Sequence, residues 1–144
     1  VLPGTYEIRE HGLQDLDDLL RIRKEAFKEF GPWYSIADEE GFKQGMRSRI
    51  GRNDVKVFVA IRDSQLIGYV ICQLDKRGSI RNISVLPEHR NMGVGSALIA
   101  RAYDFLRENK VQTVTTVTET AEGFYEKVGF NVDSKFVRVR KFVK

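Results

Sequence analysis

Two glycines and an arginine stand at a spacing that can bind an anion, in the segment from residue 82 to residue 98. Arg90 precedes Gly93 by three residues, and Gly95 follows Gly93 after one intervening residue. Glycine allows backbone conformations and close approaches that side chains forbid, and N–H groups gathered at the start of a helix attract negative charge. The spacing therefore predicts a loop whose amides hold an anion.

The elements on either side of this loop must position it. Ile83, Val85 and Leu86 have the β-branched and apolar character of a buried strand. Pro87 ends that strand because it cannot donate a ladder hydrogen bond, and from Ser96 the apolar residues recur with the period of a helix. A lone G-x-G is common and also fits an ordinary strand-to-helix turn, but the strand, arginine and helix together favour the anion site.

The loop resembles the acyl-CoA signature of the GNAT superfamily of N-acyltransferases, R/Q-x-x-G-x-G/A. A Walker A loop would need Gly-Lys-Ser/Thr where this chain has Gly95-Ser96-Ala97, and a dinucleotide fingerprint would need a small residue in place of Leu98. The resemblance implies that the loop holds the CoA pyrophosphate and that the preceding strand pairs with the pantetheine arm. It implies acetyl-CoA contacts at Ile83, Val85, Arg90, Asn91, Met92, Gly93, Val94, Gly95, Ser96, Thr118 and Tyr125.

A second segment, residues 121–130, is similar to the GNAT pattern N-x-x-A-x-x-L/F-Y-E-K-x-G-F. The Asn of that pattern, which helps to bind the CoA arm, is Thr118 here, and this departure puts its contact in doubt. The resemblance makes Tyr125 the general acid for the departing CoA thiolate. A phenol with an unperturbed pKa of about 10 is protonated at neutral pH. The alternative is that Tyr125 is an aromatic residue packed on the sheet.

Acetyl transfer to an amine needs further groups. An alkylammonium, with a pKa of about 10.4, must lose a proton before it attacks a thioester. The resulting oxyanion needs a fixed N–H donor, and the resemblance assigns that role to the backbone N–H of Val85. Relatives often have a carboxylate base on the fourth or fifth strand, but the expected strands 79–86 and 112–117 contain neither Asp nor Glu. The base is open among Glu39, Glu40, Glu119 and a chain of water molecules.

Two aromatic residues, Trp33 and Tyr34, lie between the first two expected helices beside the acidic residues 38–40. In the family, this segment forms part of the wall that contacts the acceptor. The resemblance therefore predicts that Trp33 and Tyr34 bind the amine substrate. The alternative is a solvated helix start whose acids lie at the positive end of the helix dipole.

The apolar periodicities predict strands and helices in alternation. Helices are expected at 13–30, 36–50 (interrupted by Gly41 and Gly45), 96–108 and 121–128; strands are expected at 6–9, 55–61, 65–74, 79–86, 112–117, 130–132 and 136–143. The strand–helix–strand unit around the glycine loop implies one parallel pair. The fold class is therefore α/β, a single GNAT domain over residues 1–144 with a mixed, mostly antiparallel sheet of about six or seven strands and about four helices.

The composition limits the class of protein. A chain of 144 residues with 42% hydrophobic and 31% charged residues suits one globular domain. It contains no apolar run long enough to span a membrane and no signal-peptide pattern at its start. Cys72 is the single cysteine, which suits a reducing compartment, so we expect a cytoplasmic protein. One cysteine and two distant histidines predict no metal site, and the net charge of +4 favours anionic partners.

The leading interpretation is an acetyl-CoA-dependent N-acetyltransferase that acts on a primary amine: a protein N-terminus, a lysine or a small amine. One alternative is a GNAT-fold protein that binds acyl-CoA without catalysis, which the missing strand carboxylate favours. A second is a nucleic-acid-binding domain, because basic and apolar residues alternate at 138–144. An edge strand whose charges block aggregation explains that pattern better, so nucleic acid is not expected as a partner. The terminal strands could also mediate a homodimer.

Overall fold

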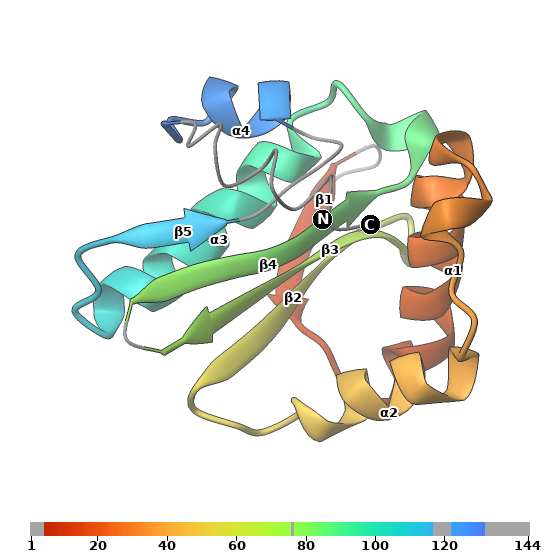
Figure 1. Cartoon of the computed structure of the whole chain (residues 1–144), viewed down its shortest axis with the longest axis horizontal. Helices are drawn as coiled ribbons and strands as arrows, with labels where there is room; N and C mark the ends of the chain where they lie inside the picture. Colours follow the sequence, from red (N-terminus) through yellow and green to blue (C-terminus); the bar gives the residue numbers. More distant parts are fainter. Residues whose placement is uncertain (1–4, 76, 117–121, 132–144) are drawn as a thin grey trace.

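The computed structural model describes residues 5–75, 77–116 and 122–131. The described part is built on a five-stranded sheet in the order β1-β2-β3-β4-β5 (Figure 1). Neighbours from β1 to β4 are antiparallel, and β4 and β5 are parallel. The strands are β1 (Tyr6–Glu10), β2 (Val55–Arg62), β3 (Gln65–Leu74), β4 (Gly78–Val85) and β5 (Val114–Thr116). The expected mixed, mostly antiparallel sheet is confirmed.

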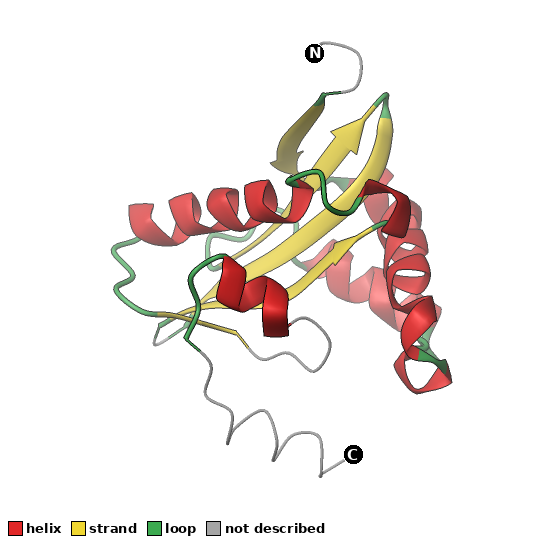
Figure 2. Cartoon of the chain, turned by 90° about the horizontal axis from the view of Figure 1, so that it is seen from above, coloured by secondary structure: helices red, strands yellow, loops and turns green. Residues whose placement is uncertain are grey.

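Among the described residues, four α-helices cover the sheet: α1 (Leu16–Phe27), α2 (Glu39–Ser48), α3 (Val94–Glu108) and α4 (Glu122–Lys127). Seen from above, α1 and α2 lie on one side of the sheet, and α3 and α4 lie on the other (Figure 2). Both long helices bury a stripe at the helical period, which supplies most of their stability. The buried stripe of α1 is Leu16, Leu19, Leu20, Ile22 and Ala26, and that of α3 is Val94, Leu98, Ile99, Ala102, Phe105 and Leu106.

Strand β4 has two irregularities: a bulge, which the sequence did not predict, and an early end to its described pairing with β5, which the expected pairing with pantetheine requires. Ile80 pairs with Cys72 and Asn82 pairs with Ile71, so Arg81 is an extra, bulged residue on β4. On its other edge, β4 pairs with β5 from Gly78 only as far as Ile80. The Thr116 hydroxyl donates to the Ile80 carbonyl at 2.8 Å at this last pair. Beyond the bulge, the described part of β5 gives β4 no further partner.

Helix α2 corrects one expectation, because it runs unbroken through Gly41 and Gly45. Each glycine costs about 1 kcal/mol in a helix interior, but other contacts offset this cost. The Asp38 carboxylate caps the helix by accepting from the Gly41 N–H at 2.8 Å. Its first turn is held by ion pairs from Lys24 to Glu39 and from Lys43 to Glu40. These contacts match a helix start whose acids lie at its positive end.

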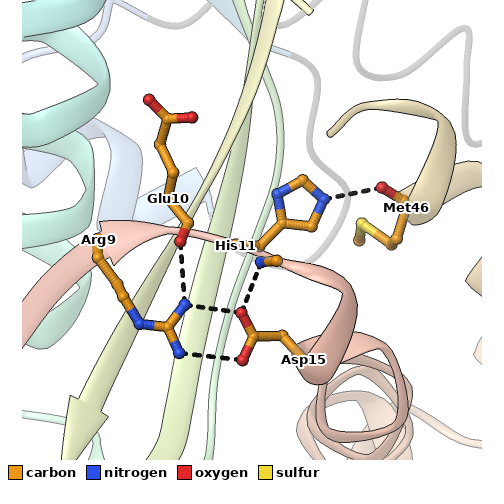
Figure 3. A network of polar contacts seen from close by, with 6 residues as sticks. Arg9, Glu10, His11, Asp15 and Met46 are labelled. Atoms are coloured by element: carbon orange, nitrogen blue, oxygen red, sulfur yellow. Dashed lines mark hydrogen bonds and ion pairs between the residues drawn. The ribbon is translucent and has the colours of Figure 1, made fainter. Parts of the chain in front are cut away.

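A polar network joins the end of β1 to the start of α1 and to the end of α2 (Figure 3). The Arg9 guanidinium donates to both carboxylate oxygens of Asp15, at 2.7 and 3.0 Å, and the Gly12 N–H donates to the same carboxylate at 2.8 Å. The His11 ring nitrogen Nε2 lies 2.7 Å from the carbonyl oxygen of Met46, near the end of α2. His11, which has no evident partner in the sequence, is thus a buried structural residue.

The other expected turns and ends are largely confirmed. The β2–β3 turn at Asp63 and Ser64 has φ angles of 50° and 65°, as a tight hairpin requires. Gly129, with a φ of 105°, follows α4. Residues 130–131 are not in a strand, and residues 132–144 of the last expected hairpin lie outside the described residues, as does the basic segment 138–144. None of the described helices has the length and apolar character needed to cross a bilayer.

Candidate active site

A cavity of about 810 Å³ lies where the end of α1, the end of β4, the glycine loop and α4 meet. It is lined by Ala26, Phe27, Phe30, Ile83, Val85, Arg90, Asn91, Gly93, Val94, Gly95, Ser96, Gly123, Phe124 and Lys127. No lining residue is acidic, and the two charged ones, Arg90 and Lys127, are positive. This lining suits a ligand that combines negative charge with a slender, partly apolar arm, as CoA does.

Eight of the eleven residues predicted to contact acetyl-CoA line this one cavity: Ile83, Val85, Arg90, Asn91, Gly93, Val94, Gly95 and Ser96. Met92 does not; its side chain is 51% exposed and its sulfur lies 3.0 Å from Nη1 of Arg62. Thr118 lies outside the described residues. Tyr125 is described but is not among the lining residues. The structure thus gathers the loop and β4 residues, which are close in sequence.

The glycine loop has the backbone shape of an anion site. Asn91 and Gly93 have φ angles of 61° and 81°, and these left-handed conformations turn successive N–H groups inward. The first intrahelical hydrogen bond of α3 runs from the Ala97 N–H to the Gly93 carbonyl at 3.0 Å. The N–H groups of Val94, Gly95 and Ser96 therefore have no partner within the helix and can serve an anion.

The second glycine of the loop is needed for packing. A Cβ on Gly95 would lie 3.0 Å from an edge atom of the Phe124 ring and 3.8 Å from the Ile83 side chain. Only glycine lets α4 approach the start of α3 this closely, so residue 95 brings Gly123 and Phe124 to the cavity. Tyr6 of β1 also fixes the loop, since its hydroxyl donates to the Gly93 carbonyl at 3.2 Å.

Arg90 uses its donors mainly on protein. Nε donates to the Val85 carbonyl at 3.1 Å and Nη2 donates to the Ala26 carbonyl at 2.9 Å. Nη1 pairs with the Glu29 carboxylate. The guanidinium therefore joins the end of α1 to the end of β4, which forms one corner of the cavity. Sequence analysis predicts Arg90 as a cofactor contact, but nothing in the sequence indicates its role as a brace between Ala26 and Val85.

The end of β4 offers main-chain groups toward β5. The Leu86 N–H donates to the Ile67 carbonyl of β3 at 2.9 Å. Because backbone groups alternate along a strand, the N–H groups of Val85 and Ile83 point away from β3. The described pairing with β5 has already ended at Ile80, so this edge can accept an amide-rich arm as an added strand. Ile83 and Val85 also line the cavity, which places the edge beside the loop.

Tyr125 lies where β4 and β5 separate. The side chain of Thr116, the last described residue of β5, lies close enough to the Tyr125 phenol to oppose the rise of the Tyr125 pKa that burial causes. The ring makes edge contacts with Phe124 and Phe130, both at centroid distances of 5.3 Å, and the residue is only 5% exposed. Burial raises the pKa of Tyr125 above its ordinary value, so the hydroxyl keeps its proton at neutral pH. Tyr125 is therefore both a packed aromatic and a protonated donor.

The aromatic wall of the cavity differs from the one expected. Phe27 and Phe30, at the end of α1 and just beyond it, line the cavity. Tyr34 does not line the cavity, but its ring packs against both phenylalanines. The distances between ring centroids are 6.0 Å to Phe27 and 5.8 Å to Phe30. The Trp33 side chain lies outside the described residues. In the sequence the two phenylalanines read as part of the apolar helix face, and the only hint was an aromatic residue directly before Gly31.

Comparison with known proteins agrees with this geometry. A family model described as an acetyltransferase (GNAT) domain matches residues 53–132. An N-alpha-acetyltransferase of Sulfurisphaera tokodaii is 24% identical over a gapped alignment of 143 residues. The alignment covers 87% of this chain and 80% of that relative. A [ribosomal protein bS18]-alanine N-acetyltransferase of Haemophilus influenzae is 37% identical over 76 residues, 49% of this chain and 51% of the relative.

A solved structure with the same fold contains the ligand class that the cavity suits. The PaiA N-acetyltransferase of Thermoplasma acidophilum, in complex with coenzyme A, superposes with a TM-score of 0.70 at 20% identity, over 90% of this chain and 91% of that one. The likeness at this identity concerns the fold. Together with the family model, which covers more than half of the sequence, it shows that the chain belongs to the GNAT family of acetyl-CoA-dependent N-acetyltransferases.

Proposed function

We propose that this chain transfers the acetyl group of acetyl-CoA directly to a primary amine while both substrates are bound. One observation supports this most: the helix-start amides of residues 94–96 and the part of β4 that has no described partner on its β5 side open into the same cavity. The first group suits a pyrophosphate, and the second suits the amides of pantetheine. Acetyl-CoA supplies the activated acetyl thioester, and the chain supplies the binding, the orientation and the proton.

Three roles follow for residues of the chain. The Val94, Gly95 and Ser96 amides hold the pyrophosphate, and the nearby Lys127 ammonium adds positive charge to the cavity. The Val85 N–H, directed away from β3, donates to the oxygen that gains negative charge when the amine attacks. The Tyr125 phenol, kept protonated by burial, donates to the departing thiolate. Its position at Thr116 supports this role, and a small movement of the ring must open it to the cavity.

The acceptor amine must lose its proton without a carboxylate in the cavity lining. Asp38 caps α2, and Glu39 and Glu40 are held in ion pairs, so these acids are already engaged at the helix start. Glu119, the other candidate base, lies outside the described residues, and among the described ones we propose a chain of water molecules leading to solvent as the proton route.

The proposed acceptor is the α-amine of a protein or peptide. The relatives of S. tokodaii and H. influenzae are named for that class of acceptor. Phe27 and Phe30 would contact the first side chain of such a substrate, because they form the aromatic wall of the cavity.

A thermal shift assay tests the cofactor, and a peptide panel tests the reaction. Acetyl-CoA at 100 times its Kd should stabilise the protein by about 2.7 kcal/mol, and ATP at the same concentration should not. Peptides with a free N-terminus should gain an acetyl group by mass spectrometry, while the same peptides with a blocked N-terminus should not. A chain that acetyl-CoA fails to stabilise does not have the proposed function.

A further inference from the structure

Arginines from α1 and from the end of α2 form a cluster over the face of β4 that points toward these helices. Ile83 and Val85 line the acetyl-CoA cavity, so Ser84 between them points to the opposite face. Ser84 pairs in register with Tyr69 of β3, and the two side chains therefore lie side by side. Both are buried, at 3% and 1% exposure. Arg23 of α1 and Arg49 at the end of α2 are near enough to the Tyr69 phenol for their charges to oppose the rise of its pKa that burial causes.

Arg23 connects this cluster to the cavity. Its guanidinium carbon lies 3.7 Å from the centroid of the Phe27 ring, and Phe27 lines the cavity. Nη1 of Arg23 donates to the Tyr34 carbonyl at 3.0 Å, which leaves most of its donors available. Arg49 has even fewer contacts, since its Nη1 reaches only the sulfur of Met46 at 3.8 Å. The positive charges of Arg81 and Arg52 also disfavour the charged form of Arg49 and lower its pKa.

These cations have no carboxylate partner in the described part of the chain. Arg9, Arg52, Arg90 and Arg107 each pair with an acid, but Arg23, Arg49 and Arg81 do not. Arg23 and Arg49 are also half-buried, and burial lowers the pKa of each. Burying a cation without a counter-charge destabilises the folded protein. Cations in this state are often found where a ligand supplies the counter-charge.

A second observation points the same way. The Ser84 hydroxyl oxygen is buried and has no hydrogen bond of good geometry in the described structure. The Tyr69 phenol lies near this hydroxyl. Burial raises the pKa of Tyr69, and the Ser84 side chain opposes that rise. Buried hydroxyls normally have a partner, so one without a well-formed hydrogen bond, near two guanidinium groups that have no carboxylate partner in the described structure, indicates a missing acceptor of hydrogen bonds.

We propose that the acceptor substrate carries an anionic group, a carboxylate or a phosphate, which Arg23, Arg49 and Ser84 bind while its amine reaches the end of β4. This inference rests on the proposed acetyl transfer, since it names the class of acceptor. The two faces of β4 then have different roles. The face with Ile83 and Val85 binds acetyl-CoA. The face with Ser84 selects the acceptor through an anionic group that lies a few bonds from the acceptor's amine.

The test compares acceptors that differ only in that charge. The pairs are alanine and alaninamide, Asp-Ala-Ala and Asn-Ala-Ala as C-terminal amides, and phosphoethanolamine and ethanolamine. Their dissociation constants are measured by calorimetry with protein saturated by CoA, so the result does not depend on turnover. In at least one pair the anionic member should bind about tenfold more tightly, the usual worth of a charge-assisted hydrogen bond. The pair that shows the preference identifies the source of the anion.

Substitutions then assign the preference to the cluster. Arg49→Gln and Arg23→Gln should each reduce it to about twofold, and Arg49→Lys should keep part of it because the charge remains. Arg107→Gln removes an exposed arginine of α3 and should leave it unchanged. Equal affinity within all three pairs, or a preference that survives both glutamine substitutions, overturns the inference. If the protein does not bind CoA at all, the proposed function itself fails.

Discussion

Nε of Arg90 donates to the carbonyl oxygen of Val85 at 3.1 Å. The first residue of the glycine-loop motif thus holds the residue whose N–H is proposed to stabilise the reaction's oxyanion. Since the same guanidinium binds the Ala26 carbonyl, it also fixes the distance between α1 and β4. Arg90 is therefore expected to act on turnover through the position of Val85.

Replacing Arg90 by lysine should separate its charge from its geometry. A lysine keeps the positive charge but cannot make three divergent contacts, so the free energy of unfolding should fall by about 1–3 kcal/mol. The kcat should fall with it, because the end of β4 loses its brace. Urea unfolding and steady-state kinetics measure the two effects, with Arg107→Lys as the surface control. Unchanged stability with a raised KM for acetyl-CoA would mean that Arg90 serves only the ligand.

The fit between Gly95 and Phe124 gives a second prediction. In Gly95→Ala the new methyl group lies 3.0 Å from the ring, so the ring and α4 must shift, at a cost of about 1 kcal/mol. The affinity for acetyl-CoA should fall about fivefold, and adding Phe124→Leu should restore part of it. Gly45→Ala adds the same methyl group to α2, outside the cavity, and should not change CoA binding. A double variant no better than Gly95→Ala would contradict the proposed contact.

The Tyr125 hydroxyl is tested by Tyr125→Phe, which keeps the packed ring. If the phenol donates to the thiolate, kcat should fall about 100-fold while the Kd of acetyl-CoA hardly changes. Because burial raises the pKa of Tyr125, the kcat of the unmodified enzyme should fall through this group only above about pH 10. Pre-steady-state kinetics and a pH profile measure this. A kcat within about twofold of the unmodified enzyme would leave Tyr125 a packing residue only.

The thiol of Cys72 should be inert in the folded protein. Burial raises the pKa of Cys72 to about 12, and the side chain is fully enclosed. Ellman's reagent at pH 8 should therefore release no colour until denaturant is added. The unfolded thiol ionises first, so this group makes stability fall as pH rises from about 9 toward 12. Rapid labelling of the native protein would show that the region between β3 and α3 opens.

The pair of Arg9 and Asp15 predicts an effect at acid pH. The Asp15 pKa is lowered although burial alone would raise it, because Arg9 and the Gly12 N–H hold the ionised form. Its stabilisation is present above the ordinary pKa of about 4 and is lost as the pH falls below it.

Asp15→Asn should cost about 2 kcal/mol at pH 7, a value that allows for the partly exposed Arg9, and should flatten the acid part of the stability curve. Asp54→Asn, which breaks the exposed pair with Arg52, should have a much smaller effect. Chemical unfolding between pH 3 and pH 8 would detect the difference between the two variants. Equal losses in both would show that burial of Asp15 adds nothing.

Local patterns were sufficient to predict the order of the elements, and the resemblance to the GNAT signature predicted most of the cavity residues. Ile83 to Ser96 is one continuous segment, so strand, loop and helix could be placed by composition and by glycine and proline alone. The unbroken α2 was missed because the cost of its two glycines is offset by an N-cap and by ion pairs with α1. Such compensation depends on tertiary contacts, which periodicity does not report.

Contacts between distant segments account for the other misses. Arg90 binds the Ala26 carbonyl 64 residues away, and Phe27 and Phe30 reach the cavity only because α1 packs at the end of β4. The cluster of Arg23 and Arg49 was likewise hidden, since each arginine alone reads as a solvated side chain. Only the sheet and two helices together bring these charges to Ser84 and Tyr69.

The bulge at Arg81 determines which face of β4 each later residue of the strand occupies. Ile80 and Ile83 pair with Cys72 and Val70 and so share a face, although they are three positions apart in the sequence. If Arg81 were paired in the ladder and not bulged, every later residue of β4 would move one place and change face, and the Ser84 hydroxyl would take the place of the apolar Val85 opposite Gly68. The proposed division between an acetyl-CoA face and an acceptor face therefore depends on the bulge. Loss of Arg81 alone would remove the bulge and keep both faces, whereas the same sequence paired without the bulge would invert the site with every side chain of the motif still present.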